Sequence, residues 1–314
     1  MQASSSLPRI SVVICTRDRA DTIGAALDSV VAQDYPEFDV LVIDQSRGDE
    51  TERIVEQTRA GFPRLRCVRL TTPGLSRAYN TGVREATADL LAFTDDDVVA
   101  PATWLRSIAT AFAAHPRVGL LYGQVLIAPE LEERENRDGV TPALAVPERR
   151  ILDREHGFRV FGMGANFAAR RSLFDRVGGF DEVLGGGGPL QSSQDFDFVY
   201  RVFKGGESTL LEPDVIVYHH GFRSHAEWPA TVRSYGIGVG GFCLKHVRLG
   251  DAYAAWLLVK FLAAAAARFA KRVLLRRPAG NQWAYLSNIV AGMRRSFRFQ
   301  IDRPHRLYRT AERT

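Results

Sequence analysis

The chain has 314 residues, a formal net charge of +5, 46% hydrophobic residues and 25% charged residues. This is the composition of an ordinary globular protein, long enough for a sizeable core and for one or two domains. Three widely spaced cysteines argue against a disulfide framework and favour a reducing compartment. Residues Met1 to Leu7 contain no basic region followed by an apolar one, so we expect no secretory signal there.

The charge is unevenly distributed along the chain. From Gly221 to Thr314 there are 17 Lys and Arg against 4 Asp and Glu, a balance of +13, whereas residues 1–220 carry 24 against 32, a balance of −8. Such a basic tail favours an anionic partner such as membrane lipid, nucleic acid or a phosphorylated acceptor, and solvated helix faces are the alternative. The tail contains no recognised motif for reading nucleic acid, so we do not expect that partner.

Short apolar runs alternate with helical patterns in the first half of the chain. Strands are expected over 10–15, 40–43, 65–70 and 90–94, and helices over 21–32, 51–59 and 75–86. This order predicts βαβ units and a mostly parallel, Rossmann-like sheet. The loops after the first, second and fourth strands hold Thr16, Asp44 and the aspartates from Asp95 to Asp97. In open α/β sheets such loops line the ligand crevice.

The second half is less regular. Helices are expected over 104–114, 171–177 and 193–203, with Ser193 as the N-cap of the last, and strands over 118–127 and 215–218. The charged, irregular residues 129–159 are expected to form a mobile segment over the site. A glycine-rich loop over 185–188 precedes Asp195 and is expected to act as a hinge that closes over a ligand.

Asp95, Asp96 and Asp97 are consecutive and directly follow an apolar strand. Carboxylates this close repel one another unless a cation lies between them. A hard divalent ion such as Mg²⁺ or Mn²⁺ is the natural occupant, and it usually brings phosphates with it. The alternative is a solvated acidic turn before the next helix.

The chain resembles the inverting family 2 glycosyltransferases with the GT-A fold. Seven motifs occur in the family order over residues 9–222: Val12 to Arg19, Asp44 to Ser46, Gly74 to Gly82, Phe93 to Asp97, Gly178 to Glu182, Gln194 to Asp197, and Pro213 to His219. The resemblance implies an α/β GT-A domain over residues 1–222, with a nucleotide-sugar half at about 9–127 and an acceptor half at about 160–222. Residues 223–314 are then a basic, helical C-terminal extension.

The resemblance also implies the reaction, which transfers a sugar from a nucleotide-diphosphate sugar to an acceptor hydroxyl. Asp95 and Asp97 match the two metal-binding positions, where Mn²⁺ or Mg²⁺ bridges the donor diphosphate, and Asp96 shares that site or faces the ribose. His219 matches the position of a third metal ligand or pyrophosphate contact. A structural histidine is the alternative.

Further donor contacts follow from the same resemblance. Thr16 and Arg17 match the loop that touches the nucleoside, and Asp44 matches the aspartate that contacts the base. Arg77 falls in the donor-binding helix, where a guanidinium pairs with phosphate in a bidentate way. For Arg77 the alternative is a surface salt bridge.

The family's catalytic base is the aspartate of a Glu-Asp pair, which Asp195 matches. Gln194 replaces the glutamate, and both the lost charge and the helix N-terminus predict a pKa for Asp195 that is lower than in a Glu-Asp pair. One alternative is therefore a catalytically impaired sugar-nucleotide-binding or scaffold protein. A nucleotidyltransferase is disfavoured because the turn after the first strand, residues 16–19, has no glycine.

Residues 252–270 form a long apolar stretch that Lys260 interrupts. On a helical wheel Lys260, Arg268, Lys271 and Arg272 gather on one side, which predicts an amphipathic helix on an anionic membrane surface. Packing on the catalytic domain or on a second copy of the chain is the alternative. A cytoplasmic enzyme, peripheral on the inner face of the cell membrane, suits a glycan or lipid-linked acceptor of the cell envelope.

Overall fold

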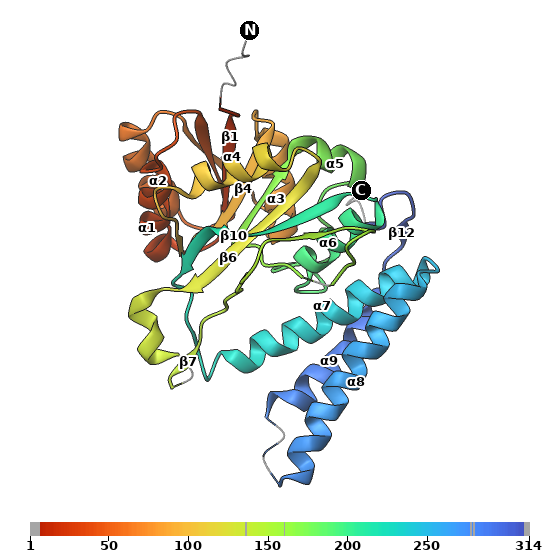
Figure 1. Ribbon diagram of the computed structural model, residues 1–314. Coiled ribbons are helices and arrows are strands. Elements are labelled where there is room, and N and C mark those ends of the chain that lie inside the picture. Colours follow the sequence, from red (N-terminus) through yellow and green to blue (C-terminus); the bar gives the residue numbers. More distant parts are fainter. Residues whose placement is uncertain (1–6, 136, 160, 277, 279, 311–314) are drawn as a thin grey trace.

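The computed structural model describes residues 7–310 apart from 136, 160, 277 and 279, so the prediction for the first residues lies outside it. Its centre is a nine-stranded sheet with helices on both faces, and three long helices follow at the C-terminal end (Figure 1). The predicted mixed, mostly parallel α/β sheet is therefore confirmed. The strands of the main sheet run in the order β3-β2-β1-β4-β9-β6-β10-β5, and β8 pairs with β10.

The strands are β1 (Ile10–Thr16), β2 (Phe38–Asp44), β3 (Leu65–Arg69), β4 (Leu90–Asp95), β5 (Val98–Val99), β6 (Val118–Ile127), β7 (Gly139–Val140), β8 (Arg150–Leu152), β9 (Asn166–Arg170), β10 (Ser208–His219), β11 (Arg223–Ser224), β12 (Ile301–Asp302) and β13 (Leu307–Tyr308). The helices are α1 (Ala20–Val31), α2 (Glu50–Gly61), α3 (Leu75–Glu85), α4 (Trp104–Ala114), the 3₁₀ helix η1 (Pro129–Arg134), α5 (Arg171–Val177), α6 (Gln194–Lys204), α7 (Trp228–Arg248), α8 (Ala252–Leu274) and α9 (Asn281–Ser296). The strands and helices predicted in the first half all form, with shifts of one or two residues at their ends.

The sheet is buried on both faces, as expected for strands with continuous apolar runs. Val12 of β1 belongs to one core with α1, α2 and α4, whereas its neighbour Val13 belongs to a second core with α3, α5 and α6. Parallel register then fixes the functional edge, because Thr16 lies opposite Asp44 and Cys15 lies opposite Asp95. The carboxyl ends of β1, β2 and β4 therefore meet at one place.

The C-terminal helices belong to a third core, which they share with α6 and the loop before it. Helix α7 approaches α9 closely through glycines: a Cβ on Gly240 would lie 2.0 Å from the carbonyl oxygen of Ile289, and one on Gly292 would lie 2.1 Å from that of Ile237. Larger residues at these positions would force the two helices apart. The extension expected from residue 223 is therefore packed into the molecule along α7.

A buried ionic cluster joins α7 to α6 and to the segment after α5, both in the predicted catalytic domain of residues 1–222 (the catalytic half below). Lys245 of α7 is fully buried, and its Nζ lies 2.6 Å from both Asp181 Oδ2 and Asp197 Oδ1. Arg201 Nε donates to Asp197 Oδ2 at 2.8 Å, and the nitrogen Nε2 of His246 lies 2.9 Å from Asp197 Oδ1. Two carboxylates thus face two permanent cations. Burial lowers the pKa of His246 to about 4, so its ring is neutral at pH 7.

Two predictions for the second half can be compared with the structure. Residues 141–144 line the cleft, as expected of a segment over the site, and β8 in the same segment pairs with β10. The mobility of segment 129–159 stays a prediction. Ser193 precedes α6 as predicted but makes no capping hydrogen bond. Its φ of 67° places it in the left-handed region, whereas a capping side chain normally belongs to an extended residue.

Candidate active site

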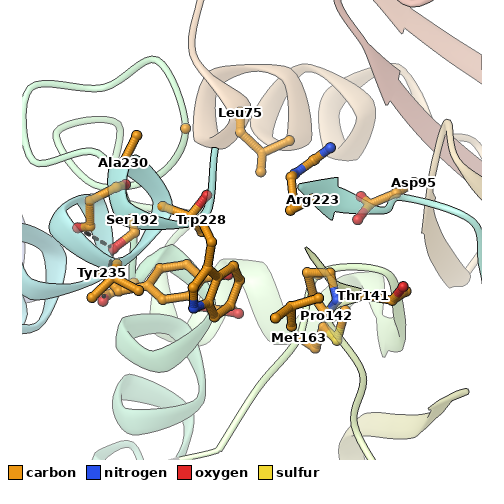
Figure 2. Close-up of a pocket in the computed structure, with 18 of the residues that line it drawn as sticks. Leu75, Asp95, Thr141, Pro142, Met163, Ser192, Arg223, Trp228, Ala230 and Tyr235 are labelled. Atoms are coloured by element: carbon orange, nitrogen blue, oxygen red, sulfur yellow. Dashed lines mark hydrogen bonds between the residues drawn. The ribbon is translucent and has the colours of Figure 1, made fainter. Parts of the chain in front are cut away.

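A cavity of about 1590 Å³ lies at the carboxyl edge of the sheet. The loops after β1 and β4 contribute Thr16 and the three aspartates, and the first turn of α6 contributes Asp195. Figure 2 shows Asp95 and Arg223 lining this cavity together with Trp228 and Tyr235 of α7. The sheet edge and the C-terminal helices therefore enclose one continuous space.

Asp95, Asp97 and His219 form a compact group of potential metal ligands. One ligand atom from each of them lies within 4.8 Å of the others. The antiparallel pairing of β5 with β10 brings His219 opposite Val98, and the backbone N–H of His220 donates to the carbonyl oxygen of Asp97 at 2.8 Å. This pairing explains how Asp97 and His219, 122 positions apart in the sequence, converge on one site.

Burial and mutual repulsion control the charge of the aspartates. Burial and the charge of Asp97 raise the pKa of Asp95 to about 7. Burial acts on Asp97 in the same direction, but the hydrogen bond from His219 and the charge of Arg19 lower its pKa to about 2. Arg19 lies 3.2 Å from Asp96 Oδ1 and 2.8 Å from Asp97 Oδ2, and Thr16 Oγ1 donates to Asp96 Oδ2 at 2.6 Å. The positive guanidinium of Arg19 therefore lies directly against Asp96 and Asp97.

These residues fit a divalent cation. Two carboxylates and an imidazole are a donor set that suits Mn²⁺ and is compatible with Mg²⁺. Among the described residues, His219 Nδ1 and Asp97 Oδ2 are buried atoms without a hydrogen-bond partner, although Asp97 Oδ2 faces Arg19. Gly221 keeps the space beside them open, because a Cβ there would lie 2.3 Å from Asp97 Oδ2.

Asp195 lies in the first turn of α6 and opens to the same cavity. Burial raises its pKa to about 6, even though its Oδ1 accepts a hydrogen bond from the N–H of Phe196 at 2.8 Å. This value lies above the 3.8 of an ordinary aspartate, because the cost of burying the charge exceeds the benefit of the helix N-terminus. The predicted lowering relative to a Glu-Asp pair stays a prediction. A carboxylate with a pKa near neutrality is suited to take a proton from an alcohol in the transition state.

The comparisons with known proteins agree with this geometry. The model of Glycosyl transferase family 2 matches residues 11–178, which is more than half of the chain. The chain belongs to glycosyltransferase family 2. The pre-mycofactocin glycosyltransferase of Mycobacterium tuberculosis is 28% identical over 194 residues, which are 59% of this chain but only 40% of that protein. The glucosyl-dolichyl phosphate glucuronosyltransferase of Haloferax volcanii is 23% identical over 73% of this chain and 75% of its own length.

A solved structure gives the same result for the fold of this glycosyltransferase. The mannosyltransferase PcManGT from Pyrobaculum calidifontis, in complex with GDP-Man and Mn²⁺, superposes with a TM-score of 0.61 and 21% identity. The match covers 93% of this chain and 88% of that one. The GT-A fold and membership of glycosyltransferase family 2 are therefore confirmed.

The donor-binding residues predicted for the glycosyltransferase lie in different surroundings. Thr16 and Arg17 line the cavity. Asp44 is fully buried; its Oδ1 accepts from the N–H of Ser46 at 2.8 Å, and its neighbour Gln45 reaches the cavity. Arg77 instead pairs with Glu182 at 3.0 Å, outside the residues that line the cavity. The position of Arg77 thus favours the salt-bridge alternative over a donor contact.

Several cavity residues were not singled out from the sequence. Arg19 could have been found, because it follows Thr16 by three positions in the same loop. Arg223, Trp228 and Tyr235 lie beyond the last family motif, so no pattern pointed to them. Their role depends on how α7 returns to the sheet edge, which only the three-dimensional structure reveals.

The glycine-rich loop lies beside the cavity and is anchored to α3. The N–H of Leu75 donates to the carbonyl oxygen of Gly186 at 2.8 Å, and Ser76 Oγ donates to that of Leu184 at 2.9 Å. Gly185 and Gly187 have φ values of 90° and 78°, which explains the need for glycine at both. The loop also packs on Gln194, since a Cβ on Gly185 would lie 3.3 Å from its side chain. Closure of this loop stays a prediction.

Proposed function

We propose that this glycosyltransferase inverts the anomeric centre while it transfers a sugar from a nucleotide-diphosphate sugar to an acceptor hydroxyl. The observation that carries the proposal is that Asp195, with its pKa raised to about 6, opens to the same cavity as the Asp95, Asp97 and His219 group. A single in-line displacement needs a base for the acceptor and charge stabilisation for the leaving group. Both requirements are met within one enclosed space.

The chemistry divides between the two groups. Asp195 takes the proton of the acceptor hydroxyl. At the same time the acceptor oxygen bonds to the anomeric carbon, and the bond from that carbon to the diphosphate breaks. Asp95, Asp97 and His219 would hold Mn²⁺ or Mg²⁺, which supplies positive charge for the diphosphate leaving group. Arg19 pairs with Asp96 and Asp97, and a bound ion would compete with it for these carboxylates. The guanidinium of Arg19 would then be available to bind the same phosphates.

The acceptor we propose is a lipid-linked or cell-envelope glycan, met at the inner face of the membrane. The haloarchaeal relative is named for action on a dolichyl phosphate-linked sugar. Helix α8 is long and apolar enough, by length and composition alone, to cross a membrane. Its exposed side carries Trp256, Val259 and Leu274, which are 51%, 63% and 84% exposed. Peripheral binding through this apolar side suits a helix that also contains Lys260.

The predicted row of four cations on α8 divides into two pairs. Lys260 and Lys271 lie next to each other along one edge of the exposed apolar side at 100° per residue, and both are exposed. Arg268 and Arg272 lie on the other side of the helix, where they bond to Gln282 and Pro278 and line the cavity. The lysines are therefore the cations to test for membrane contact.

Donor binding is tested by thermal unfolding with UDP-GlcNAc, GDP-Man and related nucleotide-sugars, each with and without Mn²⁺. A ligand at about 100 times its dissociation constant stabilises the folded state by about 2.7 kcal/mol. We expect one donor to raise the midpoint only when Mn²⁺ is present, and Asp97→Ala to lose that rise. Asp89→Ala is the matched control, because Asp89 has a side chain that is 96% exposed, outside the cavity.

The same samples separate an enzyme from a binding protein. With a donor that binds, Asp195→Asn should keep the thermal rise and lose sugar transfer, whereas the wild type should consume the donor. No stabilisation by any donor would contradict the proposal. Stabilisation without turnover in the wild type would support the catalytically impaired alternative, and full transfer by Asp195→Asn would exclude this residue as the base.

A further inference from the structure

The cavity extends beyond Asp195 into the C-terminal helices. Its far end is lined by Arg268 and Arg272 of α8 together with Asn281, Gln282 and Tyr285 of α9. None of these residues belongs to the segment that the family model matches, which ends at residue 178. The extension therefore contributes a part of the cavity that the shared catalytic half does not account for.

Tyr235 of α7 and Tyr285 of α9 line the cavity together with Asp195 and the two arginines. Their backbones are close, because a Cβ on Gly236, which follows Tyr235, would lie 2.7 Å from the carbonyl oxygen of Tyr285. The cavity that contains the proposed base is therefore continuous with the part lined by the C-terminal helices.

The two arginines at the far end are not neutralised. Arg268 Nε donates to Gln282 Oε1 at 3.2 Å, and Arg272 Nε donates to the carbonyl oxygen of Pro278 at 2.7 Å. Both partners are neutral, and within the described ranges no carboxylate lies within 4.0 Å of either guanidinium. Two such cations at the end of a cavity attract an anion, and the guanidinium fork matches the oxygens of a phosphate.

An apolar surface adjoins these cations. The C-terminal end of α8 and the start of α9 lie far from the sheet (Figure 1). Val273 and Leu274 at the end of α8 are 56% and 84% exposed, and Trp283 at the start of α9 is 56% exposed. Exposed apolar side chains beside basic ones are typical of a segment that dips into an anionic bilayer. A hydrocarbon chain leaving the arginines would therefore meet lipid.

We propose that Arg268 and Arg272 bind the phosphate of a lipid-linked glycosyl acceptor. The sugar of that acceptor extends past Tyr285 and Tyr235 to present its hydroxyl to Asp195, and its hydrocarbon follows the α8–α9 turn into the membrane. Because the arginines lie on α8 and the proposed base lies on α6, the proposal assigns the phosphate to the arginines and the nucleophilic sugar hydroxyl to Asp195. This inference rests on the proposed function, which makes Asp195 the base.

Binding is measured by isothermal titration with three probes: farnesyl phosphate, farnesol and inorganic phosphate. Farnesyl phosphate should bind the wild type at least about tenfold more tightly than either other probe, since charge-assisted hydrogen bonds and apolar burial act together. Arg268→Gln combined with Arg272→Gln should weaken it by about 100-fold, or about tenfold for each lost charged group. Arg268→Lys combined with Arg272→Lys keeps both charges but loses the guanidinium forks, so it should lose less affinity than the Gln pair.

The matched control is Arg294→Gln combined with Arg295→Gln, which removes the same charge from exposed positions of α9 outside the cavity. An equal loss in this control would refute the subsite, as would equal binding of farnesol. Equal binding of inorganic phosphate would also refute it, because a lipid would then not be recognised. Donor stabilisation with Mn²⁺ is followed in parallel: if it persists while probe selectivity is absent, only the subsite fails, and if it is absent in the wild type, the proposed function fails.

Discussion

Asp195→Asn should make the protein more stable while it stops sugar transfer. The folded protein raises the pKa of Asp195 from 3.8 to about 6, and burial is the main cause. A rise of this size means that ionised Asp195 costs the folded state about 3 kcal/mol at neutral pH. Asparagine removes that cost and can still accept the hydrogen bond from Phe196. We therefore expect a gain of about 1–3 kcal/mol at pH 7.5.

The pH dependence identifies the cause of this gain. Folded Asp195 binds its proton more tightly than unfolded Asp195, so the contribution of Asp195 to stability falls as pH rises from about 4 to about 6 and is level above that. The advantage of the asparagine variant should thus shrink to about 1 kcal/mol at pH 4.5. Urea unfolding at pH 4.5 and pH 7.5 measures both values. A variant that is no more stable at pH 7.5, or whose gain is the same at both values, would refute the reasoning.

Asp197 provides an internal control two residues along the same helix. Burial opposes its ionisation, but Lys245 and Arg201 hold its pKa well below the usual range. Its ionised form therefore stabilises the folded state, and this contribution is present above pH 4 and lost as pH falls. Asp197→Asn should accordingly destabilise the protein at pH 7.5. At pH 7.5 the change from Asp to Asn should therefore stabilise the protein at position 195 and destabilise it at position 197.

Two further substitutions address the C-terminal helices. Lys245→Met should cost about 3–5 kcal/mol in urea unfolding, because Asp181 and Asp197 are left buried without their shared cation; a loss below 1 kcal/mol would mean that the cluster does not join α7 to the catalytic half. Leu274→Asp should lower flotation with vesicles rich in anionic phospholipid by about tenfold or more, given the apolar area it withdraws. Leu7→Asp, at a leucine that is 43% exposed outside the extension, is its control, and equal flotation of both variants would contradict membrane contact at the α8–α9 turn.

The catalytic half was predictable because its signals are local. Apolar runs ending in Thr16, Asp44 and Asp95 define strands, and parallel pairing places their ends together without any further information. His219 was found through its place after a strand, although the antiparallel turn that brings it to Asp97 was not foreseen. Short-range sequence patterns and sheet register thus explain why the potential metal ligands Asp95, Asp97 and His219 lie together.

The remaining features depend on contacts between distant segments. The raised pKa of Asp195 could not be foreseen, because the helix N-terminus is visible in the sequence, whereas burial is decided by packing. Arg77 was assigned to the donor because Glu182, its partner, is distant in the sequence. The two arginines of α8 appeared to share a face with Lys260 because a helical wheel does not show which side contacts α9.

The division of the α8 cations connects the extension to catalysis. A helix that merely rested on a membrane would have no reason to turn two arginines away from lipid and toward a cavity that contains the proposed base. Nor would a helix that merely packed on the catalytic half leave Val259 and Leu274 exposed on its outer side. One arrangement accounts for both observations: the outer side meets the bilayer and the inner side holds the charged head of a lipid-linked substrate. Membrane contact and acceptor binding are then two functions of the same helix, and variants of its two sides should affect them separately.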